Sequence, residues 1–390
     1  MDPWLGPVSG EQEYEETFVI ERKRPPTVTP YERWIEQEGI PVSHGHGLAD
    51  VTEAPRGAWQ RMGGSGAYIQ LDGMEGITGL YVAEIPPGGA LNPERHIYEE
   101  VICVLRGNGL TEVWQEGGSK QVFEWHEGSL FAPPLNAWHR LFNGRASEPA
   151  IFLALTNAPL IMDLYRRPDF VYECPFEFDD RYTGQDGFFA VGDNRYQTPW
   201  GGYRWETNFI PDVRDALIDA SDTKAAGGRL TQFEISGNSL IGHISEWPAG
   251  RYHKAHYHGA GAVLLGLKSK GYVLMWPNSI GPRPYEAGRG DEVVRVDWGP
   301  SAIYCPPNGW FHQHFNTGAE SARHLALRTG SNLHPLRFAI AAKRFENGTT
   351  TSIREGGTLV EYEDEDPAIR RMYEDALVRE GVECRMPVFA

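Results

Sequence analysis

Short apolar runs, separated by turn residues, fill two stretches of the chain. Runs such as 79–85, 100–105 and 150–155 are rich in β-branched and aromatic residues. Glycine or proline interrupts them at a spacing of roughly 8–12 residues, which is typical of a small antiparallel sandwich or barrel. The pattern therefore predicts that both stretches are β-structure.

Helical periodicity is confined to the segments outside these stretches. Helices are predicted near Tyr31–Gln37, at 159–165 and 211–220, and at 336–345 and 366–377. In the last segment, apolar residues recur at i, i+3 and i+4, and Asp366–Pro367 is a typical helix start. The acidic run 361–366 before it is predicted to be a solvated linker.

The two β-rich stretches are copies of one another. Pro86–His96 aligns with Pro248–His258, and Trp125–Asn143 aligns with Trp298–Asn316 in the same order, with one longer Gly/Pro-rich loop in the second copy. A repeat of this kind predicts two homologous domains. The expected division is an N-terminal arm at 1–60, a first barrel at 61–160, a linker with short helices at 161–232, a second barrel at 233–332 and a helical tail at 333–390.

Composition narrows the class of protein. The 390 residues are 41% hydrophobic, enough for sizeable cores, and 36 Lys+Arg against 53 Asp+Glu give a net charge of −17. That charge argues against a nucleic-acid or anionic-membrane partner. The N-terminus lacks a signal-peptide pattern, and no apolar run reaches the length of a membrane span. The four cysteines stand far apart, and Cys103 and Cys305 read as buried thiols, so a cytoplasmic protein is expected.

Histidines in the second copy form a candidate metal motif. His256 and His258 are two residues apart on a predicted strand, so they point to the same face. His312 follows a Pro–Gly turn on a distant strand and can meet them inside a barrel. Three neutral imidazoles bind a divalent metal and leave coordination positions open. The sequence thus predicts a metal centre at His256, His258 and His312.

Both copies match the two cupin motifs, G(x)5HxH(x)3–4E(x)6G and G(x)5PxG(x)2H(x)3N, over roughly 75–157 and 238–330. The chain therefore resembles a bicupin. The resemblance implies an all-β fold of two tandem cupin (jelly-roll) β-barrels, with short helices in the linker and tail. Its four ligand positions fall on Glu94, His96, Glu100 and His139 in the first copy, and on His256, His258, Ala262 and His312 in the second.

The second barrel is predicted to carry the chemistry. Its three neutral histidines leave a bound metal at +2, which suits an anionic bidentate ligand, whereas two carboxylates in the first site neutralise the ion. Glu94 has an alternative partner in Arg95, which would leave the first barrel structural or metal-free.

Further residues are candidates for the site. His314 shares the face of His312 and is a candidate acid/base. Arg323 and Arg328 are an odd number of positions apart, so at most one faces inward, and Arg323 is taken as the carboxylate clamp.

Aromatic residues near the motif are either a substrate wall or ordinary core. The candidates are Trp276, Tyr304 and Trp310. His253 either gates the pocket or lies on the surface. His44–Gly45–His46 reads as a loop, with the alternative that it covers a barrel mouth.

Three functions compete. The three-His site resembles that of the gentisate dioxygenase group, which implies an Fe(II) dioxygenase that cleaves a C–C bond of a hydroxylated aromatic or related carboxylic acid with O2. That group has its functional triad in the first barrel, whereas the complete triad is in the second barrel here, so the match is partial. The alternatives are a redox-neutral Mn, Zn or Ni lyase, isomerase or decarboxylase, and a non-catalytic binding bicupin. A homo-oligomer is expected in each case.

Overall fold

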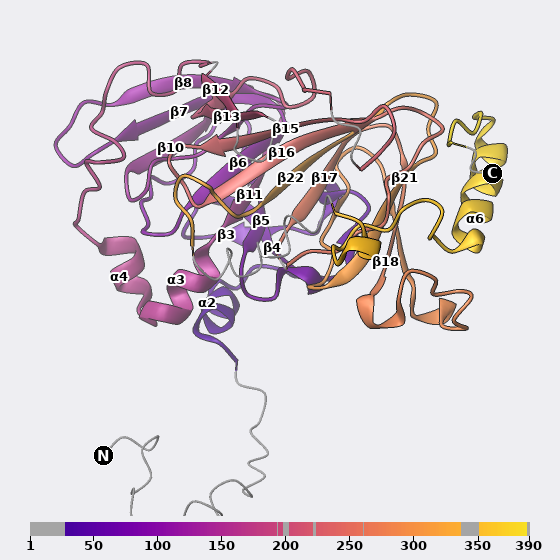
Figure 1. The fold of residues 1–390 in the computed structure, drawn as a ribbon. Helices are drawn as coiled ribbons and strands as arrows, with labels where there is room; N and C mark the ends of the chain where they lie inside the picture. The colour runs from indigo at the N-terminus through magenta and orange to yellow at the C-terminus, as the bar shows by residue number, and fades with distance from the viewer. Residues whose placement is uncertain are drawn as a thin grey trace, which may run out of the picture.

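Two β-barrels account for most of the chain. The computed structural model describes residues 28–192, 194–197, 203–220, 224–259, 261–336 and 351–387. Each barrel pairs one eight-stranded sheet with one three-stranded sheet, and the two lie side by side (Figure 1). The predicted all-β fold of two tandem jelly-roll barrels is confirmed.

The first barrel contains a sheet ordered β1-β4-β5-β11-β6-β9-β14, with β3 beside β4, and a second sheet ordered β10-β7-β8. Its strands are β1 (Val42–Gly45), β3 (Gly57–Trp59), β4 (Gly64–Leu71), β5 (Gly79–Ile85), β6 (Glu100–Arg106), β7 (Asn108–Trp114), β8 (Gln121–His126), β9 (Leu130–Phe131), β10 (Trp138–Asn143) and β11 (Ala150–Thr156).

The second barrel repeats this arrangement, with the sheets β12-β13-β15-β16-β22-β17-β20-β2 and β19-β18-β21. Its strands are β12 (Asn194–Gln197), β13 (Tyr203–Thr207), β15 (Arg229–Ile235), β16 (Leu240–Trp247), β17 (Val263–Lys268), β18 (Gly271–Pro277), β19 (Val294–Trp298), β20 (Ile303–Tyr304), β21 (Trp310–Asn316) and β22 (Ala322–Thr329).

The barrels exchange strands. The arm strand β2 (Gly47–Leu48) pairs with β20 of the second barrel, whereas β14 (Phe209–Ile210), which precedes the second barrel, pairs with β9 of the first. Each sheet is thus completed by a segment that lies next to the other barrel in sequence. The exchange fastens the two barrels together.

A shared core lies between the two larger sheets. It contains Val101 and Leu153 of the first barrel together with Ile244 and Leu325 of the second, all nearly inaccessible to solvent. Side chains alternate along β22, so Leu325 faces this shared core while the neighbouring Ala326 belongs to the core inside the second barrel. The alternation places the polar residues of the motif inside the barrels.

Most predicted helices are confirmed. Helix α2 (Pro30–Glu38) has a capping box at Thr29, α3 (Ala158–Tyr165) and the additional, unpredicted α4 (Pro168–Glu173) follow the first barrel, and α6 (Pro367–Glu380) is capped by Asp366. The first three lie together at one end of the first barrel (Figure 1). The described helices include none long and apolar enough to cross a membrane.

One predicted helix is wrong, and another falls almost entirely outside the residues that the structure describes. Residues 211–220 contain turns instead, because β14 pairs with β9 just before them and Val213 N–H donates to the Gly128 carbonyl at 2.9 Å. The backbone of this segment thus joins the first barrel. The helix predicted at 336–345 lies outside the described residues beyond its first position.

The acidic run 361–366 is not a solvated linker. Glu365 is buried, where it accepts hydrogen bonds from Tyr252 Oη and, at 3.1 Å, from Gln313 Nε2. Asp366 is buried as the helix cap. The run anchors a C-terminal layer, which includes α6, against the outer face of β18 and β21 (Figure 1).

Candidate metal centres

The same backbone frame presents the candidate ligands in both barrels. In the first, Glu94 and His139 exchange two backbone hydrogen bonds of 3.0 and 2.9 Å. In the second, His256 and His312 exchange two of 3.2 and 2.9 Å. Glu94 therefore occupies the position of His256, as the motif alignment predicts.

The first cluster brings four ligand groups together. His96 Nε2 and His139 Nε2 each lie 3.7 Å from Glu100 Oε2, and His139 Nε2 lies 3.8 Å from Glu94 Oε1. Ligand atoms of Glu94, His96 and His139 all lie within 4.8 Å of one another. Three of the four residues are buried, with Glu94 partly exposed.

Hydrogen bonds turn the imidazoles toward the centre of this cluster. His96 Nδ1 lies 2.8 Å from the Tyr98 carbonyl and His139 Nδ1 lies 3.2 Å from the Ala137 carbonyl. A carbonyl accepts only, so Nδ1 carries the proton and Nε2 presents a lone pair. Both Nε2 atoms and Glu100 Oε2 are buried without a hydrogen-bond partner among the described residues. Such a donor set fits a divalent cation, which would satisfy all three atoms.

Polar side chains surround the first cluster. Tyr81 Oη donates to Glu100 Oε1 at 2.5 Å, and the ring of Tyr98 stacks on His96 at 3.6 Å. Glu94 pairs with Arg61, not with Arg95, which lies over the ring of Trp138. The proposed surface pair of Glu94 and Arg95 is therefore wrong.

Arg61 ties the cluster to the N-terminal helix. Its Nε donates to Glu38 Oε2 at 2.9 Å, and its guanidinium lies 4.8 Å from the ring centre of Tyr172 and 5.1 Å from that of Trp59. Aromatic faces and two carboxylates hold this cation beside the metal ligands.

The second cluster consists of His256, His258 and His312, whose ligand atoms lie within 4.8 Å of one another. Each Nδ1 faces a backbone carbonyl, at 3.0, 2.8 and 3.1 Å respectively, so each Nε2 presents a lone pair. Ala262 holds the motif's Glu position. A cation, Lys224, lies here instead, with Nζ 2.9 Å from His256 Nε2.

The clusters differ in electrostatics. Burial lowers the pKa of His139, while Glu94 and Glu100 act in the opposite direction. Burial and then Lys224 hold the pKa of His256 well below its usual range. Burial would raise the pKa of Glu100, but the adjacent His96 and His139 keep it below its ordinary value. The first cluster thus combines imidazoles with carboxylate charge, and the second combines imidazoles with a cation.

His314, the candidate acid/base, lies beside the second cluster. Its ring centre is 5.5 Å from that of His312, and its Nδ1 lies 2.8 Å from Tyr304 Oη. The same hydroxyl lies 3.0 Å from His324 Nδ1, which makes a buried His–Tyr–His chain. His253 is also buried, with its ring 4.3 Å from that of Trp247, so it is not a surface residue.

Two other predicted site residues lie away from the cluster. Arg323 pairs with Glu246 at 3.0 Å and donates to carbonyls of the 213–216 turn segment, so it does not reach the histidines. Trp276 follows Met275, the partner of His312 in the sheet, and therefore points to the opposite face, where it packs under the C-terminal layer.

Trp310 and the HxH motif of the arm are neighbours. The rings of His46 and Trp310 are 5.9 Å apart, and His46 Nδ1 lies 3.1 Å from Asp72 Oδ2. His44 is exposed on β1. The arm therefore lies against the second barrel at Trp310, the alternative left open by the sequence.

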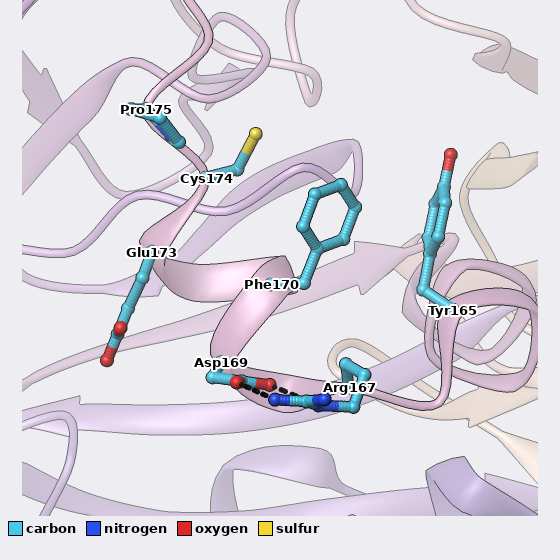
Figure 2. Close-up of a pocket in the computed structure, with 7 residues that line it drawn as sticks. All are labelled: Tyr165, Arg167, Asp169, Phe170, Glu173, Cys174 and Pro175. Atoms are coloured by element: carbon cyan, nitrogen blue, oxygen red, sulfur yellow. Dashed lines mark hydrogen bonds and ion pairs between the residues drawn. The ribbon is translucent and has the colours of Figure 1, made fainter.

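A surface hollow of about 500 Å³ lies at α3 and α4. Figure 2 shows its lining, with Arg167 paired to Asp169 and the ring of Phe170 beside Cys174. Leu164, which precedes the lining residue Tyr165, is exposed. The hollow holds none of the candidate ligands.

Sequence reasoning missed Arg61 and Lys224. Neither belongs to a motif, because Arg61 comes from the segment before β4 and Lys224 from the segment before β15. Only the folded backbone brings them to the clusters. The spacing of the histidines carried no signal for either.

The strand order and the paired clusters define a class of protein, the two-barrel β proteins with one candidate metal centre in each barrel. Comparison with solved structures finds chains that are similar at low sequence identity. An oxalate decarboxylase of Bacillus subtilis is 11% identical, with a TM-score of 0.45, over 73% of this chain and 77% of that one. The oxalate decarboxylase of Lactobacillus farciminis is 11% identical, with a TM-score of 0.47, over 73% and 86%. No family model and no curated protein matches.

Proposed function

We propose that the chain is a metal-dependent enzyme that acts on a small carboxylate by redox-neutral chemistry, as a lyase, isomerase or decarboxylase, with the first cluster as its metal centre. The observation that carries the proposal is the convergence of three buried ligand atoms, His96 Nε2, His139 Nε2 and Glu100 Oε2, that have no hydrogen-bond partner among the described residues. Burying such atoms unsatisfied is costly, and a divalent cation satisfies them together.

Two imidazoles and two carboxylates would hold the ion. This mixed nitrogen and oxygen set suits Mn(II), Fe(II), Ni(II) or Zn(II). When bound, the metal would supply Lewis-acid polarisation of a substrate carboxylate. Glu100 is held by Tyr81, and Glu94 by Arg61.

Arg61 and the neighbouring tyrosines suit recognition of an anion. The guanidinium places positive charge beside Glu94, and Tyr98 Oη and Tyr172 Oη lie 3.3 Å apart, close to the same cation. These donors would orient a substrate carboxylate and exclude water from it. Tyr98 stacks on His96, so this polar wall adjoins the ligands themselves.

The oxygen-dependent alternative belongs to the second cluster. An Fe(II) dioxygenase acting on a hydroxylated aromatic acid would use His256, His258 and His312, with His314 and Tyr304 next to them. The ammonium of Lys224 lies 2.9 Å from His256 Nε2, where its positive charge disfavours a bare divalent ion. We therefore place the proposed reaction in the first barrel.

Metal analysis combined with turnover under nitrogen tests the proposal. We expect Glu100→Ala to lose one equivalent of metal and the activity on short carboxylates, while His256→Ala keeps both. His44→Ala, at an exposed arm histidine, is the control. Turnover should persist without oxygen. Stoichiometric O2 uptake with a hydroxylated aromatic acid, abolished only by His256→Ala, would transfer the function to the second barrel. A chain without any bound transition metal would leave only a binding role.

A further inference from the structure

One arginine contacts a candidate metal ligand and a helix at the same time. The Arg61 guanidinium donates through Nη1 to Glu94 Oε2 and through Nε to Glu38 Oε2, the latter at 2.9 Å. Glu94 is a candidate ligand of the first cluster, whereas Glu38 is the last residue of helix α2. The ligand and the helix therefore share one cation.

Aromatic rings hold the guanidinium in this shared position. Its centre lies 5.5 Å from the ring centre of Trp34, which belongs to α2, and 5.1 Å from that of Trp59. Trp59 Nε1 also donates to Glu38 Oε2, so the carboxylate at the end of the helix has two donors. The side chains of Arg61 and of both carboxylates are mostly buried, so water screens their interaction only in part.

Arg61 competes with a metal ion for the carboxylate of Glu94. Glu94 Oε2 faces the guanidinium, while Oε1 lies 3.8 Å from His139 Nε2, on the side of the other ligand groups. The more tightly Arg61 holds Glu94, the less of its negative charge is left to attract a cation. Glu38 draws the guanidinium toward α2 and weakens that hold. The carboxylate at the end of α2 therefore favours metal binding, and a bound metal in turn favours the docking of α2.

We propose that Arg61 is a positioning residue that couples metal binding at the first cluster to the attachment of helix α2. The helix has other contacts as well, because Tyr31 N–H donates to Asp163 Oδ1 of α3 at 2.9 Å. A change at Arg61 thus alters how tightly α2 is held without releasing it. The proposal rests on the proposed function in taking the first cluster as a metal site, and it adds a control on that site that needs no substrate.

Co(II) binding to the full chain tests the coupling at the metal. The His256→Ala background removes the second cluster, and His312→Ala is the substitute background if that variant does not fold. We expect Glu38→Gln to weaken Co(II) binding by about fivefold or more, the lower end for coupling between two sites. Glu36→Gln is the matched control, because Glu36 is an exposed glutamate of the same helix, and it should leave the affinity unchanged. Titration calorimetry gives both affinities.

Arg61→Lys separates the bridge from the charge. The variant keeps the positive charge but lacks the planar fork that holds two carboxylates at once. In this variant, Glu38→Gln should change Co(II) affinity no more than Glu36→Gln does. An effect of Glu38→Gln that persists in full would come from long-range charge alone and would overturn the proposal.

Hydrogen exchange of the α2 amides measures the same coupling from the helix. Saturating Co(II) should slow this exchange by a similar factor of about fivefold, and should not slow it in Arg61→Lys. Helix α6, which packs in the C-terminal layer, is the internal reference. If Co(II) binds and α2 does not respond, the coupling is refuted while the metal centre stands. A chain that binds no Co(II) refutes both.

Discussion

At the scale of single residues, hydrogen bonds decide which atoms the clusters present. Five imidazoles across the two barrels share one arrangement, with Nδ1 facing a backbone carbonyl. Because that arrangement fixes the tautomer, both clusters offer Nε2 lone pairs. The difference between them lies in the neighbours, carboxylates in one and an ammonium in the other.

Tyr81 is expected to hold Glu100 for metal binding. Tyr81→Phe removes the hydroxyl that donates to Glu100 Oε1 at 2.5 Å while it keeps the ring in the core. We expect metal affinity of the first cluster to fall by about tenfold to a hundredfold, as for other residues that orient a ligand. Competition with a chelator measures this fall. Tyr272→Phe, at a buried tyrosine of the second barrel, should leave the affinity unchanged.

Motif positions were predictable because they repeat in the sequence. Both ligand sets, including the replacement of His by Glu94 and of Glu by Ala262, follow from aligning the two copies. The partners of those ligands were not predictable. Arg61 and Lys224 are long-range neighbours, and no local pattern encodes which cation reaches which cluster.

At the scale of elements, helix caps and strand pairing explain which of the predicted helices formed. Helices α2 and α6 carry their own start signals, Thr29 and Asp366, and formed as expected. The 211–220 segment has helical composition, but strand pairing of β14 and burial of Val213 override it. Tertiary contacts therefore decide whether a segment with weak helical propensity forms a helix.

Asp366 is expected to be a costly cap to remove. Its carboxylate accepts from Ala368 N–H at 2.9 Å and also from Tyr285 N–H at 2.7 Å and Glu286 N–H at 2.9 Å. Asp366→Ala should lower the free energy of unfolding by about 2 kcal/mol, the upper end for a cap. Thr29→Ala, which loses one such bond, should cost about 1 kcal/mol. Urea unfolding compares the two, and equal losses would contradict the role of the loop contacts.

Glu365 gives the C-terminal layer a pH dependence. Burial raises the pKa of Glu365 above its ordinary 4.5, although Tyr252, Gln313 and Arg370 oppose the shift, and Asp366 adds to it. The folded state therefore holds the proton more tightly than the unfolded state. The stabilisation that this tighter proton binding gives the folded state is complete below pH 4.5. It declines as the pH rises through the raised pKa of Glu365.

The Glu365→Gln variant isolates this contribution. It cannot ionise, so the difference in unfolding free energy between wild type and variant should move in the variant's favour as the pH rises from 4.5. Urea unfolding at a series of pH values measures that difference. A difference that does not change with pH would exclude Glu365 as the source.

At the scale of the whole molecule, the two barrels form one unit. Strands β2 and β14 cross between them, and Glu99, which is buried, accepts from Ser239 N–H at 2.9 Å and from Asn157 Nδ2 at 3.1 Å. With a net charge of −17, the overall field would repel the small carboxylate proposed as substrate, which would have to be attracted by local cations such as Arg61. Self-association and a cytoplasmic location stay predictions.

Cooperative unfolding follows from this construction. Leu325 is fully buried in the core that the barrels share, so Leu325→Ala should cost about 2–5 kcal/mol through lost burial and a cavity. Each barrel needs the other's strand and the common core. The substitution should therefore lower the midpoint temperature of one thermal transition shared by both barrels. Leu274→Ala, in the outer core under α6, provides the comparison. Calorimetric and van't Hoff enthalpies should agree for the wild type, and tryptophan fluorescence should report the same midpoint as circular dichroism. Two transitions, of which only one moves in Leu325→Ala, would show that the exchanged strands and the shared core do not couple the barrels.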